Sequence, residues 1–64
     1  MNPYEQYINK TFLSKDGKNV GLITDCSQNS SGKWVFVLFD VAQGVSMKYP
    51  ADLFLEHNPW AFNN

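Results

Sequence analysis

The run from Trp34 to Phe39 constrains the fold of this chain more than any other segment. Its residues are all β-branched, aromatic or leucine, and it ends at Asp40. Such a run is typical of a β-strand. Because successive side chains of a strand point to opposite faces, only one apolar face can turn toward the interior of a small fold. The other face needs a cover from elsewhere in the chain or from a partner.

The length of the chain allows one domain. With 64 residues, the chain cannot build two cores that are each stable alone. Its composition, 44% hydrophobic and 17% charged, is that of a folded rather than a disordered protein. Cys26 is the single cysteine, so an intramolecular disulfide is excluded, and no cluster of cysteine and histidine has metal-ligand spacing. We therefore expect residues 1–64 to fold as one domain without metal or cofactor.

The N-terminal segment has neither the basic region nor the apolar run of a targeting signal. No stretch approaches the roughly 20 consecutive apolar residues of a membrane span. The expectation is a soluble cytoplasmic protein that does not contact a membrane.

Turn-forming residues divide the chain into short elements. Pro3 after the possible cap Asn2, with apolar side chains at helical spacing, predicts a helix over residues 3–10. Gly21 indicates a bulge or tight bend in the strand that contains it. Pro50 is expected to start a single helical turn before the last strand, and a tail follows over residues 57–64. Polar turns separate the expected strands, at residues 11–13, 20–26, 33–39, 45–49 and 53–56.

Several of these segments together resemble a known family. The residues concerned are Val20-Gly21-Leu22-Ile23, then Val35, Val37 and Phe39-Asp40, then Met47-Lys48-Tyr49-Pro50 with Leu53-Phe54. Their spacing resembles the SH3-like barrels of the Tudor and KOW type, such as those at the C-terminal end of some bacterial DNA helicases. The resemblance covers residues 11–56. It implies an all-β SH3-like barrel of about five short antiparallel strands with a short N-terminal helix, and a binding module as its function.

The resemblance also assigns the two faces of the central strand. It places Val35, Val37 and Phe39 inside the barrel, so that the alternate side chains lie outside. In one interpretation, aromatic residues of the N-terminal helix or of the tail cover that outer face. In the other, part of it binds a protein partner or a second copy of the chain, since aromatic residues are typical interface anchors. The candidate partner-binding residues are Trp34, Phe36, Leu38, Tyr4, Tyr7, Trp60 and Phe62.

A catalytic function finds little support in the sequence. Cys26 and His57 are the only candidates for a nucleophile and a base, and no motif positions a third group beside them. Paired carboxylates and a glycine-rich phosphate loop are both missing. We therefore expect a protein that is not an enzyme, with Cys26 as a small buried side chain and His57 at the surface.

The basic residues argue against strong nucleic-acid binding. Formal net charge is −1 and the chain has no arginine, the residue best suited to bidentate recognition of phosphate and guanine. A KOW-like or Tudor-like module that contacts phosphate through lysine remains the alternative hypothesis. Its candidate residues are Lys10, Lys15, Lys18, Lys33 and Lys48.

Acidic residues near strand ends suggest a further hypothesis. They are most simply turn residues, but a cluster of them would form an acidic rim suited to a basic partner. Together with the small size and the seven asparagines of the chain, such a rim would fit a phage or mobile-element inhibitor of a host protein. The residues are Asp16, Asp25, Asp40, Asp52 and Glu56.

Overall fold

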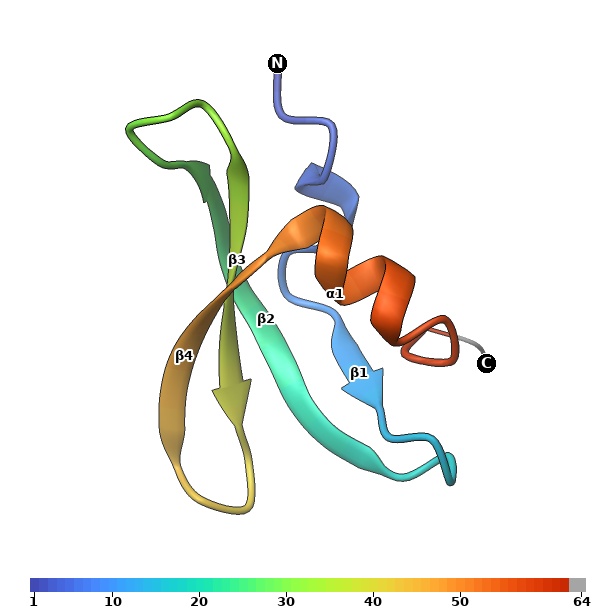
Figure 1. Cartoon of the computed structure of the whole chain (residues 1–64). Coiled ribbons are helices and arrows are strands. Elements are labelled where there is room, and N and C mark those ends of the chain that lie inside the picture. The colour runs from blue at the N-terminus through green and yellow to red at the C-terminus, as the bar shows by residue number, and fades with distance from the viewer. Residues whose placement is uncertain (63–64) are drawn as a thin grey trace.

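The computed structural model describes residues 1–62 and contains mainly β-structure. Within these residues, four antiparallel strands form one open sheet in the order β1-β2-β3-β4 (Figure 1). The mostly-β class predicted from the sequence is thus confirmed. The elements in chain order are the 3-10 helix η1 (Glu5–Tyr7), β1 (Thr11–Leu13), β2 (Asn19–Gln28), β3 (Trp34–Asp40), β4 (Val45–Pro50) and the helix α1 (Ala51–His57).

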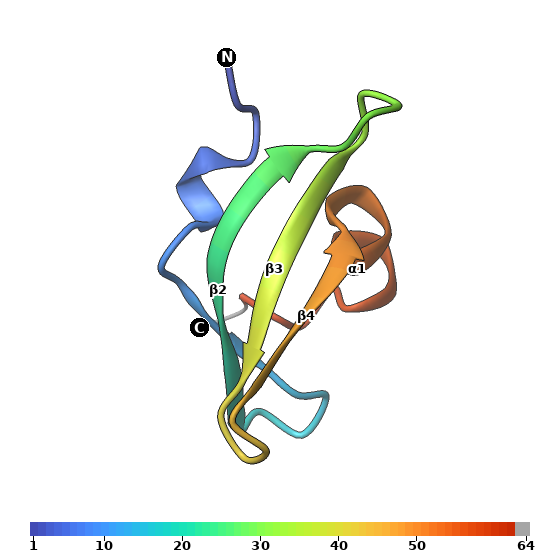
Figure 2. The ribbon, with the colours of Figure 1, turned by 90° about the vertical axis from the view of Figure 1, so that its left-hand side faces the viewer.

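The sheet has one covered face and one open face. The helix α1 lies against one face, which we call the inner face, and Figure 2 looks onto the opposite, outer face. The core lies between the inner face and α1. Its buried residues are Ile23, Cys26, Phe36, Leu38, Ala51, Phe54 and Ala61.

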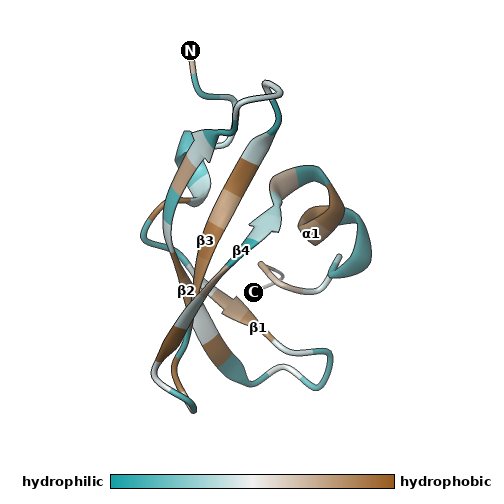
Figure 3. Ribbon diagram, turned by 60° about the vertical axis from the view of Figure 1, so that its left-hand side comes forward, coloured by the Kyte–Doolittle hydropathy of each residue, from teal (hydrophilic) through white to brown (hydrophobic). Residues whose placement is uncertain are grey.

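The side of β3 that faces the core is the opposite of the one that the resemblance implies. Figure 3 shows β3 as hydrophobic along most of its length, so composition alone favours neither face. Phe36 is 0% and Leu38 is 6% exposed, whereas Val35 and its alternate neighbours are only half-buried. The prediction that Phe36 and Leu38 lie outside is therefore wrong. The physical reason is that the large ring of Phe36 fills the space in front of α1, which a valine would leave partly empty.

The last predicted strand is a helix instead. Residues 53–56 belong to α1, which starts directly after Pro50, whose φ of −56° suits the residue that precedes a helix. Ala51 and Phe54, three residues apart, are buried on the same side of this helix. At the other end, the Asn58 side chain donates a hydrogen bond to the carbonyl oxygen of Phe54 at 3.0 Å. The apolar residues at 53–55 therefore follow helical rather than strand periodicity.

The N-terminal helix is shorter than predicted. Of residues 3–10, only Glu5–Tyr7 form a helix, of the 3-10 type. Asn2 accepts a hydrogen bond from the backbone N–H of Tyr4 at 2.8 Å, as expected of a residue that precedes a helical turn. Asn9 has a φ of +69°, and its N–H bonds the carbonyl oxygen of Ile23 at 2.7 Å. This turn directs the chain into the sheet.

The strand β2 is irregular next to Gly21, as the sequence predicts. Phe12 pairs with Gly21 but Leu13 pairs with Asn19, so β2 contains an extra residue, Val20, at this point. A Cβ atom on Gly21 would lie 2.6 Å from the carbonyl oxygen of Phe39 and would also meet the Phe12 ring. The Phe12 ring therefore packs directly over the glycine backbone on the inner face of the sheet.

Replacement of Gly21 by alanine is expected to destabilise the fold by roughly 1–3 kcal/mol, the usual cost of an extra methyl group in a packed region. Urea unfolding measures this loss. The control is Gly17→Ala, because Gly17 has a φ of +86° but open space around its Cα, so only the backbone strain of about 1 kcal/mol applies. Equal losses for the two variants would contradict the close packing at Gly21.

Candidate functional site

The aromatic residues proposed as a binding surface form the cover of the core. The Phe36 ring centroid lies 5.7 Å from that of Tyr4, 5.8 Å from Tyr7 and 5.8 Å from Phe54, all in edge-to-face geometry. Such pairs stabilise by about 0.5–1.5 kcal/mol beyond their area burial. The interpretation in which the N-terminal segment covers the side of β3 that carries Phe36 and Leu38 is therefore confirmed. Phe36 and Leu38 are not accessible to a partner in this state.

The remaining aromatic candidates lie half-buried around the rim of the core. Trp34 lies 6.5 Å from Tyr4, and Phe62 lies 4.9 Å from Tyr7, between ring centroids. The Lys15 ammonium lies 5.8 Å from the ring of Trp60, a cation–π arrangement. Tyr4 and Tyr7 also lie 6.4 Å apart, so Trp34, Tyr4, Tyr7 and Phe62 form a connected row of half-buried rings, whereas Phe36 and Leu38 lie beneath the surface.

The outer face of β3 carries a row of apolar side chains that the fold covers only in part. Val35, Val37 and Phe39 lie along it, all half-buried. Leu22 pairs with Phe39 from β2, and directly paired residues share a face, so Leu22 extends the stripe. We call these four residues, Leu22, Val35, Val37 and Phe39, the outer stripe.

Polar side chains flank the outer stripe on both neighbouring strands. Val37 pairs with Asp25 of β2 on one side and with Lys48 of β4 on the other. A shallow hollow of about 110 Å³ lies at one end of the stripe. It is lined by Val35, Val37 and Lys48, by Ser27 and Gln28 at the end of β2, and by Asn29 in the turn that follows. An apolar centre with a polar rim is the usual composition of a protein-binding surface.

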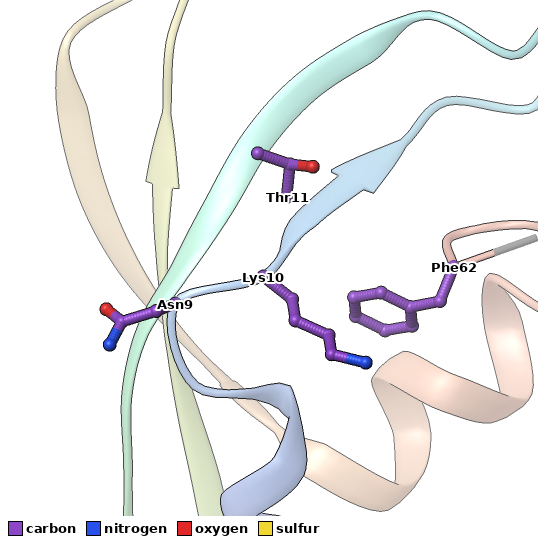
Figure 4. A pocket seen from close by; sticks show the side chains of 4 residues that line it. All are labelled: Asn9, Lys10, Thr11 and Phe62. Atoms are coloured by element: carbon purple, nitrogen blue, oxygen red, sulfur yellow. The ribbon is translucent and has the colours of Figure 1, made fainter. Parts of the chain in front are cut away.

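A second hollow lies between β1 and the chain after α1. It has a volume of about 330 Å³ and is lined by Asn9, Lys10, Thr11 and Phe62. Figure 4 shows the side chains of Lys10 and Phe62 pointing into the same space, while Asn9 extends away from them. One ammonium beside one ring offers few fixed polar groups, so this hollow lacks the convergent contacts of a specific small-molecule site.

The lysines proposed for nucleic-acid binding do not form one patch. Lys18 lies 4.0 Å from Asp16 and Lys33 lies 3.8 Å from Asp52, both as exposed ion pairs. Lys15 lies over the Trp60 ring. Lys10 lines the hollow beside β1, and Lys48 lies on the outer face of β4. Three of these five ammonium groups thus have a carboxylate or aromatic partner.

Several of the acidic residues have local structural roles, as the turn interpretation predicts. Asp40 accepts a hydrogen bond from the N–H of Gln43 at 3.1 Å in the β3–β4 turn. Asp16 accepts one from the Ser14 hydroxyl in the β1–β2 turn. Asp25 accepts a hydrogen bond from the N–H of Cys26, and Asp52 from that of Leu53. Their carboxylates are distributed over both ends of the sheet.

The two candidate catalytic side chains have different environments. Cys26 is 6% exposed in the core. Burial raises the pKa of its thiol, the hydrogen bond with Asn2 opposes this, and the charge of Asp25 raises it further. His57, at the end of α1, has its Nδ1 3.3 Å from the Tyr49 hydroxyl. A buried thiol with a raised pKa is a poor nucleophile. Among residues 1–62, no group of three or more His, Cys, Asp and Glu side chains is arranged to hold a metal ion.

Sequence reasoning missed the outer stripe because it assigned Val35, Val37 and Phe39 to the interior. The alternation that defines the stripe is visible in the sequence, but both sets of alternate residues are apolar. The half-exposed Val37, between Asp25 and Lys48 on adjacent strands, shows which set faces outward.

Neither helix within residues 1–62 has the length and apolar character that crossing a membrane requires. Comparisons of the chain with models of known protein families, with curated proteins and with solved structures returned no match. The functional argument therefore rests on the surface of this chain.

Two phenylalanines of β3 test the assignment of its faces. Replacement of the buried Phe36 by leucine should lower the free energy of unfolding by more than replacement of the half-buried Phe39 by leucine, because a ring with no solvent exposure loses more contacts. The corresponding alanine variants should differ further, with a loss of about 3–5 kcal/mol at Phe36. Chemical unfolding followed by circular dichroism measures both pairs. A larger loss at Phe39 would reverse the assignment.

The pKa of Cys26 makes a prediction about stability at alkaline pH. Because burial raises the pKa of this thiol in the folded state, folding retains a proton that the unfolded chain releases. The resulting stabilisation is fully present below the unfolded pKa of about 8.5 and is lost as the pH rises through the folded pKa. Unfolding free energies at pH 7 and pH 10 should therefore fall more for the wild type than for Cys26→Ala. Equal decreases would show that the thiol does not contribute.

Proposed function

We propose that this chain is a small non-enzymatic module that binds another protein through the outer stripe of its sheet. One observation carries this proposal: Leu22, Val35, Val37 and Phe39 form an apolar row on the sheet face opposite α1 (Figure 2). Contiguous apolar surface on a small protein is costly in water and commonly marks an interaction site. The polar residues beside the stripe supply the rim that orients a partner.

The environments of Cys26 and His57 support the non-enzymatic part of the proposal. The thiol lies in the core and has a raised pKa, and the imidazole is held near the Tyr49 hydroxyl. Neither hollow offers a nucleophile, a base and an orienting group together.

We propose further that the fold is a variant of the SH3-like barrel. The meander β2-β3-β4 followed by a helical segment supports this. After α1 the chain returns to β1, where the N–H of Leu13 donates a hydrogen bond to the carbonyl oxygen of Ala61 at 2.7 Å. In a closed barrel, a fifth strand would pair with β1 at this position. A single bond in place of a strand would leave the barrel shortened, and this relationship rests on the order of elements.

A valine-to-lysine pair tests the binding surface. Val37→Lys places a charge at the centre of the outer stripe, and Val41→Lys places the same charge on a 61% exposed valine in the β3–β4 turn. Both variants should fold, because Val37 is half-buried and on the solvent side of β3. We expect Val37→Lys to reduce binding of a partner captured from source-cell lysate at least tenfold, as buried unpaired charges at interfaces do, and Val41→Lys to leave it unchanged.

Binding by Val37→Lys equal to that of the wild type would contradict the proposal, and so would the failure of the wild type to retain any protein. The captured protein also tests the hypothesis of an inhibitor from a phage or mobile element, which requires a host protein as the specific partner.

Nucleic acid is the weaker candidate, because the lysines are dispersed and partly paired. Titration of single- and double-stranded DNA and RNA at low salt separates the two functions. We expect no binding that weakens steeply with salt, since few free ammonium groups converge on one surface. Micromolar binding with a steep salt dependence would replace the protein-binding proposal by the KOW-like or Tudor-like one.

A further inference from the structure

The strand β4 forms an edge of the sheet. Within residues 1–62 it pairs with β3 alone, and Figure 1 shows no other segment beside the half of β4 that follows the β3–β4 turn. An edge strand presents unpaired N–H and C=O groups in a row, which can pair with a strand from another chain.

The hydrogen-bond pattern identifies which backbone groups of β4 point away from β3, toward the free edge of the sheet. Ile23 of β2 bonds the segment before β1 through both its N–H and its C=O. Backbone groups alternate in direction along a strand, so Leu22 bonds its partner Phe39 on β3. The carbonyl oxygen of Val37 accepts a bond from the Thr24 hydroxyl of β2, which agrees with this alternation.

The same alternation continues into β4. Since Phe39 and Val37 use their backbone groups toward β2, their β4 partners, Ser46 and Lys48, direct theirs away from the sheet. The next outward position is Pro50, which has no N–H. The free edge therefore offers the N–H and C=O groups of Ser46 and Lys48 as its main pairing groups.

Apolar side chains lie beside this edge. Val45 is 45% and Met47 is 47% exposed. Met47 pairs with Leu38 and so lies on the inner face, but beyond the cover that buries Leu38. The strand contains no acidic residue, and Lys48 is its one charged side chain. A single lysine limits edge pairing less than several charges would.

We propose that a second copy of this chain pairs with β4, antiparallel and with the two-fold axis at Met47. In this register, Ser46 of each copy pairs with Lys48 of the other and exchanges both backbone bonds with it. Met47 then faces its own counterpart in the non-hydrogen-bonded position, where opposed side chains are closest. Val45 lies opposite Tyr49 on the same face.

The sequence of the edge fits a second copy because this register satisfies every outward group of Ser46 and Lys48. It places no lysine directly opposite another, since Lys48 faces Ser46 on the partner. A register centred on Lys48 would oppose two ammonium groups, which is destabilising. The formal net charge of −1 adds little repulsion between copies.

Such a dimer goes beyond the proposed function, because β4 pairing leaves the outer stripe uncovered in both copies. The two four-stranded sheets would join into one, with both outer stripes on the same continuous face. A partner with two matching sites could then bind both copies at once, which raises its apparent affinity.

Opposite charges at Ser46 test the register. Ser46→Glu places a carboxylate opposite Lys48 of the other copy twice per dimer, and Ser46→Lys places an ammonium there. Sedimentation equilibrium over a concentration series should show dimerisation of the wild type, strengthened about two- to thirtyfold by Ser46→Glu and weakened by a similar factor by Ser46→Lys. Net charge alone predicts the reverse order, since these variants carry −2 and 0 against −1 for the wild type.

The same substitutions at Ser30, an exposed residue of the β2–β3 turn, provide the matched control and should leave dimerisation unchanged. Hydrogen exchange of the Ser46 and Lys48 amides should slow as the concentration of wild-type protein rises. A wild type that remains monomeric to about 1 mM would overturn the proposal, whether or not it binds another protein. Dimerisation that follows net charge, or that leaves the two amides unprotected, would overturn it as well.

Discussion

The packing of the Phe36 ring is the interaction on which the rest of the structure depends. Its side chain, with no exposed surface, touches Tyr4 and Tyr7 from the N-terminal segment and Phe54 from α1. One ring thereby joins the N-terminal segment and α1 to β3, a central strand of the sheet. A chain of 64 residues has few other ways to connect these parts, because area and entropy terms nearly cancel in a domain of this size.

The position of the core on one face of the sheet explains where apolar side chains remain exposed. The aromatic residues gather on the inner face, so the outer face of β3 carries smaller aliphatic side chains, with Phe39 at one end. Within residues 1–62, α1 and the residues after it do not reach around the sheet to cover this outer face (Figure 2). Likewise, α1 lies near the end of β4, so Val45 and Met47 project beyond the core. The outer stripe and the exposed side chains of β4 thus both result from the position of α1 and the N-terminal segment on one face of the sheet.

The sequence was informative about where strands occur and less so about what they face. Turn residues such as Gly17 and Gly44, both with positive φ, delimit the strands as expected, and Cys26 is buried as predicted. Periodicity could not choose the inner face of β3, because both alternate sets are apolar. Nor could it separate helix from strand at Leu53-Phe54-Leu55, since a short apolar run fits either. That choice depends on Phe54 reaching Phe36, a contact between distant segments.

Adjacent residues of β3 offer the most direct test of the central claim, that Phe36 and Leu38 face the core and Val35 and Val37 face solvent. A soluble paramagnetic probe relaxes methyl protons according to their exposure, and Val37 and Leu38 carry methyl groups one residue apart on opposite faces. NMR should show strong relaxation enhancement for the methyl groups of Val35 and Val37, and little for those of Leu38 and Ile23, which is 0% exposed. Stronger enhancement at Leu38 than at Val37 would contradict the fold and the binding surface together.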